Sequence, residues 1–172
     1  MNVDSFIDHI IMTIYCANTS WGHNREWWRP RGENGKWQWL IVDLDRGFNI
    51  NNSNTNLVDN LKDDYELFQY LLNSPFFVDR FVQRSAAHLS NTFFAERMNS
   101  IVDSLGSMIN LEMPKHIDRW GNEGGIPSMN IWESALEEIK QFAENRSTIV
   151  QNQMMDELNM EGTVEVIVNV QP

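Results

Sequence analysis

The chain has 172 residues, enough for one domain with a substantial apolar core and too few for two. Its formal net charge is −11 and its pI is about 4.7, so it lacks the clustered Lys and Arg that hold nucleic-acid phosphates. Cys16 is the only cysteine, which excludes an intrachain disulfide and a cysteine-based zinc site. We expect a single domain that binds no nucleic acid and has no membrane span.

The first predicted element is a helix over residues 4–16. Asp4 or Ser5 stands where an N-terminal capping residue is expected. The stretch 18–24 that follows is rich in turn-forming residues and predicts a loop. The helix is indicated by an apolar stripe with steps of three and four residues, made of Val3, Phe6, Ile7, Ile10, Ile11 and Ile14.

An aromatic β-hairpin is predicted next. The segments REWWR (25–29) and KWQWLIVDLD (36–45) flank the turn PRGENG, a pattern typical of two paired strands. The second strand is expected to reach the acids at its end. Two roles fit the hairpin indoles, a stacking platform for a ligand or packing against the helices, and packing is the expected role for Trp27, Trp28, Trp37 and Trp39.

The remainder of the chain predicts helices. After an asparagine-rich loop over residues 49–60, apolar residues recur at three- and four-residue steps in four segments. The sequence therefore predicts a mainly α protein of the α+β class with one small hairpin. The expected helical segments are 63–74, 74–91, 92–121 and 131–158.

Several polar residues mark the expected starts of these helices. Ser74 precedes a proline at the first helical position, Thr92 precedes the next helix, and Asn130 forms a capping-box pattern with Glu133. His88 falls within a helix, where it is expected to be a packed or capping residue rather than a ligand.

Asp43 and Asp45 form a D-x-D motif at the end of the predicted second strand. Side chains alternate along a strand, so both acids are expected on one face. Carboxylate oxygens suit a hard divalent cation that takes its other ligands from water and substrate phosphates. The alternative is that the acids merely end the strand and face solvent or Arg46. Asn24 favours the metal site, because a loop Asn, a hairpin and a terminal Asp occur in this order in protein kinases.

Several separated blocks of the sequence carry a resemblance to a known family. They are WGHNREWWR, GKWQWLIVDLDRGF, LLNSPFFVDRFVQRSAAHLSNTF, ERMNSIVDSL and MPKHIDRWG. Together they resemble the spore coat protein H (CotH) kinase family, from about residue 4 to residue 158. The resemblance implies the helical C-lobe of a kinase-like fold over residues 1–158. Residues 159–172 are expected to be a linker or the first strand of a following β-domain.

The resemblance also implies an activity. CotH-like proteins are atypical protein kinases that transfer phosphate from ATP to Ser or Thr of a protein substrate, with Mg²⁺ or Mn²⁺. Asp43 matches the metal-binding acid, Asp45 the second acid and Asn24 the loop Asn. An extracytoplasmic or spore-coat location is implied as well.

The parts with which an N-terminal lobe holds ATP are not found in the sequence. There is no Gly-rich phosphate loop and no strand Lys paired to a helix Glu. We therefore expect a C-lobe fragment that is inactive alone and whose partners are its own missing N-lobe and the acceptor protein.

The loop departs from the family pattern at Ser20. Relatives carry an Asp about five residues before the loop Asn, whereas this loop is one residue shorter and has Ser20 in that place. A neutral hydroxyl cannot act as a carboxylate base would. His23 is the nearest substitute base, although a hydrogen bond within the loop is its expected role. A pseudokinase that binds or assembles a partner, and a structural domain without ligand, are the alternatives to a kinase.

The segment HIDRWG, residues 116–121, ends one predicted helix. Arg119 is expected to pair with an acid, because a guanidinium and a carboxylate make a directional contact. Together with Trp120 it is expected to support the catalytic loop from behind.

Overall fold

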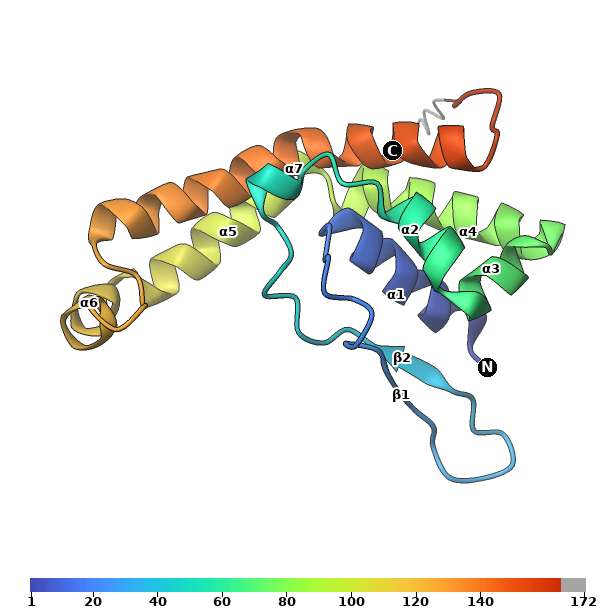
Figure 1. Cartoon of the computed structure of the whole chain (residues 1–172), viewed down its shortest axis with the longest axis horizontal. Helices are drawn as coiled ribbons and strands as arrows, with labels where there is room; N and C mark the ends of the chain where they lie inside the picture. The colour runs from blue at the N-terminus through green and yellow to red at the C-terminus, as the bar shows by residue number, and fades with distance from the viewer. Residues whose placement is uncertain (165–172) are drawn as a thin grey trace, which may run out of the picture.

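The computed structural model describes residues 1–164, and residues 165–172, which belong to the expected following strand, lie outside the described residues. Figure 1 shows a helical body, a projecting two-stranded hairpin and a long helical arm. The predicted mainly helical composition with one small hairpin is confirmed. The helices are α1 (Val3–Tyr15), α2 (Leu57–Asp64), α3 (Glu66–Leu72), α4 (Pro75–Ala87), α5 (Ala95–Asn110), α6 (Met113–Trp120) and α7 (Met129–Glu157).

The hairpin consists of β1 (Glu26–Trp28) and β2 (Gln38–Leu40), which pair antiparallel with Trp27 opposite Trp39. The first turn of α1 holds β2 in place. The Ser5 hydroxyl accepts a hydrogen bond from the Trp39 amide at 2.8 Å, and the amide of Asn2 donates to the Trp37 carbonyl at 2.9 Å. The hairpin therefore leaves the body in a direction set by the start of α1.

Helix α1 lies at the centre of the core. Its apolar stripe is almost fully buried, because α2, α4, α7 and β2 all pack around it (Figure 1). Phe6 contacts the rings of Trp39, Tyr65 and Phe77, which joins the hairpin to the helices. Burial of large apolar side chains on this scale is the main stabilising contribution to the body. The body in turn fixes the end of α1, from which the candidate site begins.

Three of the expected helix starts differ from those in the structure. Asn2, not Asp4 or Ser5, caps α1, because its side-chain oxygen accepts hydrogen bonds from the amides of both residues. Ser128, not Asn130, caps α7. Helix α5 begins only at Ala95, after Thr92 has bonded to a histidine in the preceding turn. The start of α4, where Ser74 precedes Pro75, is confirmed.

Two predicted segments have the wrong extent. The asparagine-rich loop is shorter than expected, since it includes a 3₁₀ turn (Ile50–Asn52) and α2 already begins at Leu57. Leu57 and Val58 are buried, so core packing forms this helix despite its polar surroundings. The single helix expected over 92–121 breaks at Leu111 and Glu112 into α5 and α6.

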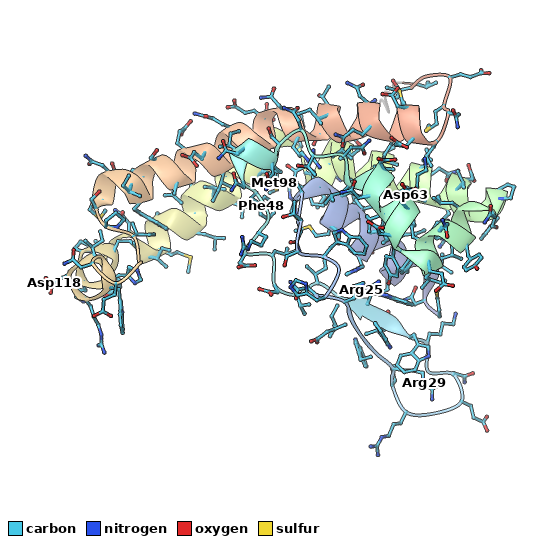
Figure 2. All side chains as sticks on the ribbon, in the orientation of Figure 1. Arg25, Arg29, Phe48, Asp63, Met98 and Asp118 are labelled. Atoms are coloured by element: carbon cyan, nitrogen blue, oxygen red, sulfur yellow. The ribbon has the colours of Figure 1, made fainter. Side chains whose placement is uncertain are left out.

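The helical arm consists of α5, α6 and the N-terminal half of α7, and it extends away from the body (Figure 1). Helices α5 and α7 run antiparallel and approach closely at Gly106, where an added Cβ would lie 2.9 Å from the end of the Leu136 side chain. Helix α6 lies at the tip, where Figure 2 labels Asp118. None of the described helices is both long enough and apolar enough to cross a membrane.

A row of ion pairs joins α1 to α4. Arg80 contacts Asp4 and Arg84 contacts Asp8, each through two nitrogens, and His88 adds a contact to Asp8 at 3.0 Å. His88 is the C-terminal cap of α4 and begins the π-helical turn η2 (His88–Thr92), which confirms its expected structural role. Bidentate pairs of this kind fix the relative position of two helices.

These pairs predict a loss of stability in acid. Burial raises the pKa of Asp8, but hydrogen bonds from Arg84 and His88 outweigh it and leave this pKa below its ordinary value. The contribution of the carboxylate is therefore complete above about pH 4 and is lost as the pH falls through the lowered pKa. Replacing Asp8→Asn should reduce the free energy of unfolding by up to about 1 kcal/mol at pH 7, since the pair is partly exposed.

Urea unfolding at pH 7 and pH 3 measures this difference. The gap between wild type and Asp8→Asn should shrink at the lower pH. Asp63→Asn is the matched control, because Asp63 is exposed and forms no ion pair with any described residue. An equal gap at both pH values would contradict the prediction.

Candidate functional site

The site begins where α1 ends. Ala17 adopts a left-handed conformation with φ of +52°, and the amides of Ala17 and Asn18 donate back to Ile14 and Thr13. This pair of hydrogen bonds is the Schellman arrangement, which usually has glycine at the left-handed position. Ala17 is fully buried, so packing of its methyl group retains it here. The loop 18–24 therefore leaves the helix in a fixed direction.

The D-x-D segment does not lie on a strand, so the prediction that β2 reaches the acids is wrong. Strand β2 ends at Leu40, and Asp43 adopts a left-handed conformation with φ of +52°. A turn then brings the amide of Phe48 to the Cys16 carbonyl at 2.8 Å. Gly47 fits closely in this turn, since a Cβ there would lie 3.1 Å from the Cβ and the carbonyl oxygen of Cys16. The acids are thus positioned by a turn docked on the end of α1.

Two asparagines join the loop to the D-x-D segment. The side-chain amides of Asn18 and Asn24 both donate to the main-chain carbonyl of Asp43, at 3.4 and 3.5 Å. The left-handed conformation of Asp43 turns this carbonyl towards the loop, while its carboxylate stays exposed. The structure therefore brings Asn24 and Asp43 together, and Asp45 follows two residues later on the same turn.

Asn18 is a site residue that the sequence did not single out. It is buried, and its side-chain oxygen accepts a hydrogen bond from the Ser20 amide at 3.1 Å. One side chain thus shapes the loop and holds the D-x-D segment. The sequence feature that could have indicated Asn18 is N-T-S directly after a helix. In such a sequence the Asn side chain often accepts a hydrogen bond from the amide of the residue two positions later.

Ser20 and His23 contact each other within the loop. The Ser20 hydroxyl and Nε2 of His23 are 3.0 Å apart, on the exposed side of the loop. The position that the resemblance matches to an acid is therefore occupied by a hydroxyl that contacts an imidazole. The imidazole of His23 can accept the proton of this hydroxyl. Neither member of the pair is a carboxylate that could act as the base.

The donor set at this site fits a hard divalent cation. Asp43 and Asp45 have exposed carboxylates that form no ion pair with any described residue, and the Asn24 amide is adjacent. Such oxygen donors suit Mg²⁺ or Mn²⁺ when waters and phosphates complete the coordination. Within residues 1–164, no three His, Cys, Asp or Glu side chains come together as a complete metal site. The two carboxylates and the Asn24 amide would therefore fill only part of the coordination shell of such a cation.

Arg146 binds the end of α1, from which the site begins, and this role was not predicted from the sequence. It lies on α7 and is fully buried, yet it contacts no carboxylate among the described residues. Its guanidinium donates to the carbonyls of Ile14 and Tyr15 at the end of α1, and to those of Ser53 and Thr55. Burial lowers the pKa of Arg146 to about 10, which still leaves it charged at neutral pH. The sequence feature that could have indicated this role is a single Arg within the apolar face of α7.

The hairpin tryptophans are mostly exposed, so the expectation that they pack in the core is wrong for three of the four. Trp27, Trp28 and Trp37 are 54%, 49% and 42% exposed, and only Trp39 packs against the core. The hairpin projects from the helical body (Figure 1), which leaves its outer part, where Figure 2 labels Arg29, away from the helices.

A groove lies beside the loop. Its lining includes Gly22 and His23 of the loop, Trp27 and Trp37 of the hairpin segment, and Tyr65. The guanidinium of Arg25, another lining residue, lies over the Tyr65 ring, 4.8 Å from its centre, and its Nε donates to the Gly22 carbonyl at 2.9 Å. Aromatic walls with a few polar groups are typical of binding sites.

Arg119 and Trp120 lie far from this loop. They belong to α6 at the tip of the arm, which packs on α5 and α7 (Figure 1). Arg119 lies over the Trp120 ring at 4.7 Å and forms no ion pair with the described residues, so the expected acid partner is not found. The structure places neither side chain behind the catalytic loop.

Comparison with known proteins identifies the family. Neither the curated proteins nor the solved structures include a match to this chain. A protein-family model described as CotH kinase protein matches residues 1–150, which is most of the chain and includes the loop, the hairpin and the D-x-D turn. The chain therefore belongs to the CotH kinase family.

Proposed function

We propose that residues 1–158 form the C-terminal lobe of a CotH-type protein kinase that transfers phosphate from ATP to Ser or Thr of a protein substrate. The lobe supplies the metal-facing side of the nucleotide site, and a separate N-terminal lobe supplies the phosphate-binding loop. The fragment alone is accordingly inactive. The protein acts outside the cytoplasm or in the spore coat.

One observation carries this proposal. Asn24 and Asp43 come from opposite sides of the hairpin in sequence, yet the Asn24 amide donates to the Asp43 carbonyl at 3.5 Å. This contact supports the proposal, because nucleotide-dependent phosphate transfer needs the two proposed metal-binding residues close together. A bound divalent cation would neutralise the phosphate charge.

Each residue has a distinct part in the proposed site. Asp43 and Asp45, which are both exposed, would hold the metal through their carboxylates, and the side-chain oxygen of Asn24 would be the remaining protein donor. Asn18 and Arg146 hold the loop and the end of α1 in position. The groove lined by Trp27 and His23 receives the acceptor segment, which brings its hydroxyl next to the loop.

Metal and nucleotide binding test the proposal. In the protein joined to its N-terminal lobe, Mg²⁺ or Mn²⁺ with ATP should raise the melting temperature by several degrees, because ligand at 100 times its Kd adds about 2.7 kcal/mol. Asp43→Ala should abolish this shift, since it removes a metal carboxylate. Thermal denaturation with and without each ligand measures the effect.

Asp63→Ala is the matched control, because this exposed acid on α2 lies outside the loop and the D-x-D turn (Figure 2). It should leave the shift intact. The proposal fails if metal and ATP shift neither the wild type nor the control, or if Asp43→Ala responds as the wild type does.

A pseudokinase is the second candidate function. It is favoured by the hydrogen bond between Ser20 and His23 at the position where relatives have an acid. Such a protein would retain the fold and the metal site and would recognise or assemble a partner without transferring phosphate.

A further inference from the structure

Ser20 is held in place through both its main chain and its side chain. The Ser20 amide donates to the side-chain oxygen of Asn18 at 3.1 Å, which fixes the main chain. The Ser20 Oγ lies 3.0 Å from Nε2 of His23, which fixes the side chain. The loop therefore sets the position and the direction of this hydroxyl, although Ser20 is only half-buried and His23 is exposed.

The contact with His23 gives this hydroxyl the arrangement of an activated nucleophile. A serine hydroxyl is a weak nucleophile by itself, and it becomes effective when a base within hydrogen-bond distance accepts its proton. In the tautomer that carries the ring proton on Nδ1, Nε2 of His23 is such an acceptor. Thr19 provides a matched hydroxyl, because it is the exposed neighbour of Ser20 and, of the two, only Ser20 contacts an imidazole among the described residues.

Two short connections lead from Ser20 to the D-x-D turn. The side chain of Asn18, which holds the Ser20 amide, also donates to the Asp43 carbonyl at 3.4 Å. His23 directly precedes Asn24, whose side-chain amide donates to the same carbonyl at 3.5 Å. The loop therefore carries a hydroxyl with an adjacent base next to the residues proposed to hold the phosphates of ATP through a cation.

We propose that Ser20 is a site of self-phosphorylation, at which its hydroxyl accepts the γ-phosphate of ATP within the same molecule. Self-phosphorylation rests on the proposed function, because it requires the nucleotide site. The Ser20 Oγ forms a bond to the γ-phosphorus, the bond between that phosphorus and the β–γ bridging oxygen breaks, and ADP leaves. The hydroxyl proton passes to Nε2 of His23 and then to water. The phosphoserine carries a charge of about −1.5 to −2 at neutral pH, at the position that the resemblance matches to an acid.

The intramolecular arrangement favours Ser20 over a hydroxyl of another protein. The groove proposed to receive the acceptor segment is lined by His23. An acceptor hydroxyl must first bind there, whereas the Ser20 hydroxyl already contacts the imidazole. Reacting groups that belong to one molecule avoid the entropy cost of being brought together. The rate of self-phosphorylation per molecule should therefore not depend on the protein concentration.

The reactivity of the hydroxyl is tested in the 172-residue chain, without ATP or metal. An alkyl fluorophosphonate forms an adduct with an activated serine and releases fluoride, and peptide mass spectrometry locates the adduct. We expect it on Ser20, absent in Ser20→Ala and formed about 100-fold more slowly or less in His23→Ala, because a positioned base contributes roughly that factor. Thr19→Val is the matched control and should react as the wild type does.

Phosphate transfer is tested in the protein joined to its N-terminal lobe, with Mg²⁺ or Mn²⁺ and ATP. Mass spectrometry should find a phosphate on Ser20, which Ser20→Ala and Asp43→Ala lack and Thr19→Val retains. The rate per molecule should stay unchanged on dilution. Asp43→Ala mixed with the wild type should remain unmodified, because the transfer occurs within one molecule.

The two experiments distinguish failure of self-phosphorylation from failure of the proposed function. A thermal shift with metal and ATP but no phosphate on Ser20 would overturn self-phosphorylation and leave the proposed function standing. Neither a thermal shift nor a phosphate would overturn both. A chain that does not react with the fluorophosphonate, or that reacts as fast in His23→Ala as in the wild type, would overturn the activated hydroxyl. Circular dichroism confirms that each variant is folded.

Discussion

Replacing Arg146→Ala should lower the free energy of unfolding by about 4 kcal/mol, a large share of the 5 to 15 kcal/mol of an ordinary domain. The substitution removes the charged hydrogen bonds to four carbonyls. It also leaves the carbonyl of Tyr15 buried without a partner, and an unsatisfied buried acceptor costs more than a lost contact. Urea unfolding followed by circular dichroism measures the loss.

Two further variants show whether geometry or charge is responsible. Arg146→Lys keeps the charge but cannot reach four carbonyls with a planar fork, so it should recover only part of the stability. Arg97→Ala removes an exposed arginine and should have little effect on stability. A loss below about 1 kcal/mol for Arg146→Ala would show that water or other groups satisfy the carbonyls instead.

Replacing Ser20→Asp should raise phosphate transfer from ATP by about 100-fold or more in the protein joined to its N-terminal lobe. A carboxylate at this position can accept the proton of an acceptor hydroxyl, whereas the serine hydroxyl cannot. Radiolabelled transfer to a protein acceptor measures the rate. The prediction assumes that Asn18 still orders the loop, since its contact is to the main-chain amide of Ser20 and survives the substitution.

Ser20→Asn is the matched control, because it has nearly the shape of Asp without its charge. It should show no gain. His23→Ala, made in the wild-type background, tests whether the imidazole bonded to Ser20 acts as the base. Activity in the wild type that His23→Ala abolishes would identify an enzyme with a substitute base, and gain only in Ser20→Asp would identify a pseudokinase. No rise in any variant would contradict the assigned role of this position.

The long helices were predictable because one face of each is apolar at helical spacing. Helix α1 and the arm helices follow this pattern over many residues, so local sequence and tertiary packing agree. Helix α2 was missed, since it is short and its asparagine-rich approach resembles a loop; burial of Leu57, Val58 and Leu61 forms it. The caps differ because a capping side chain is selected by where the chain turns, and several neighbouring residues were equally suitable.

The candidate site was predictable in its residue types and not in its geometry. Asn24 and Asp43 were chosen from their order around the hairpin, and the structure places them in contact. The turn at Gly47 was not foreseen, because it depends on docking against Cys16, a contact between distant parts of the chain. The role of Arg146 was not foreseen for the same reason. No local sequence pattern shows to which distant carbonyls a buried guanidinium will donate.

The distance along the chain between Arg146 and its partners has a consequence for biosynthesis. Its acceptor at Tyr15 lies 131 residues earlier, and ribosomes add about 5 to 20 residues per second. On the order of ten seconds therefore pass between the synthesis of the end of α1 and the synthesis of Arg146, which binds its carbonyls. Contacts this remote also form late in folding, because a long loop must close first. The loop that carries Ser20 and Asn24 is among the first parts of the protein to be synthesised and among the last to be fixed in place.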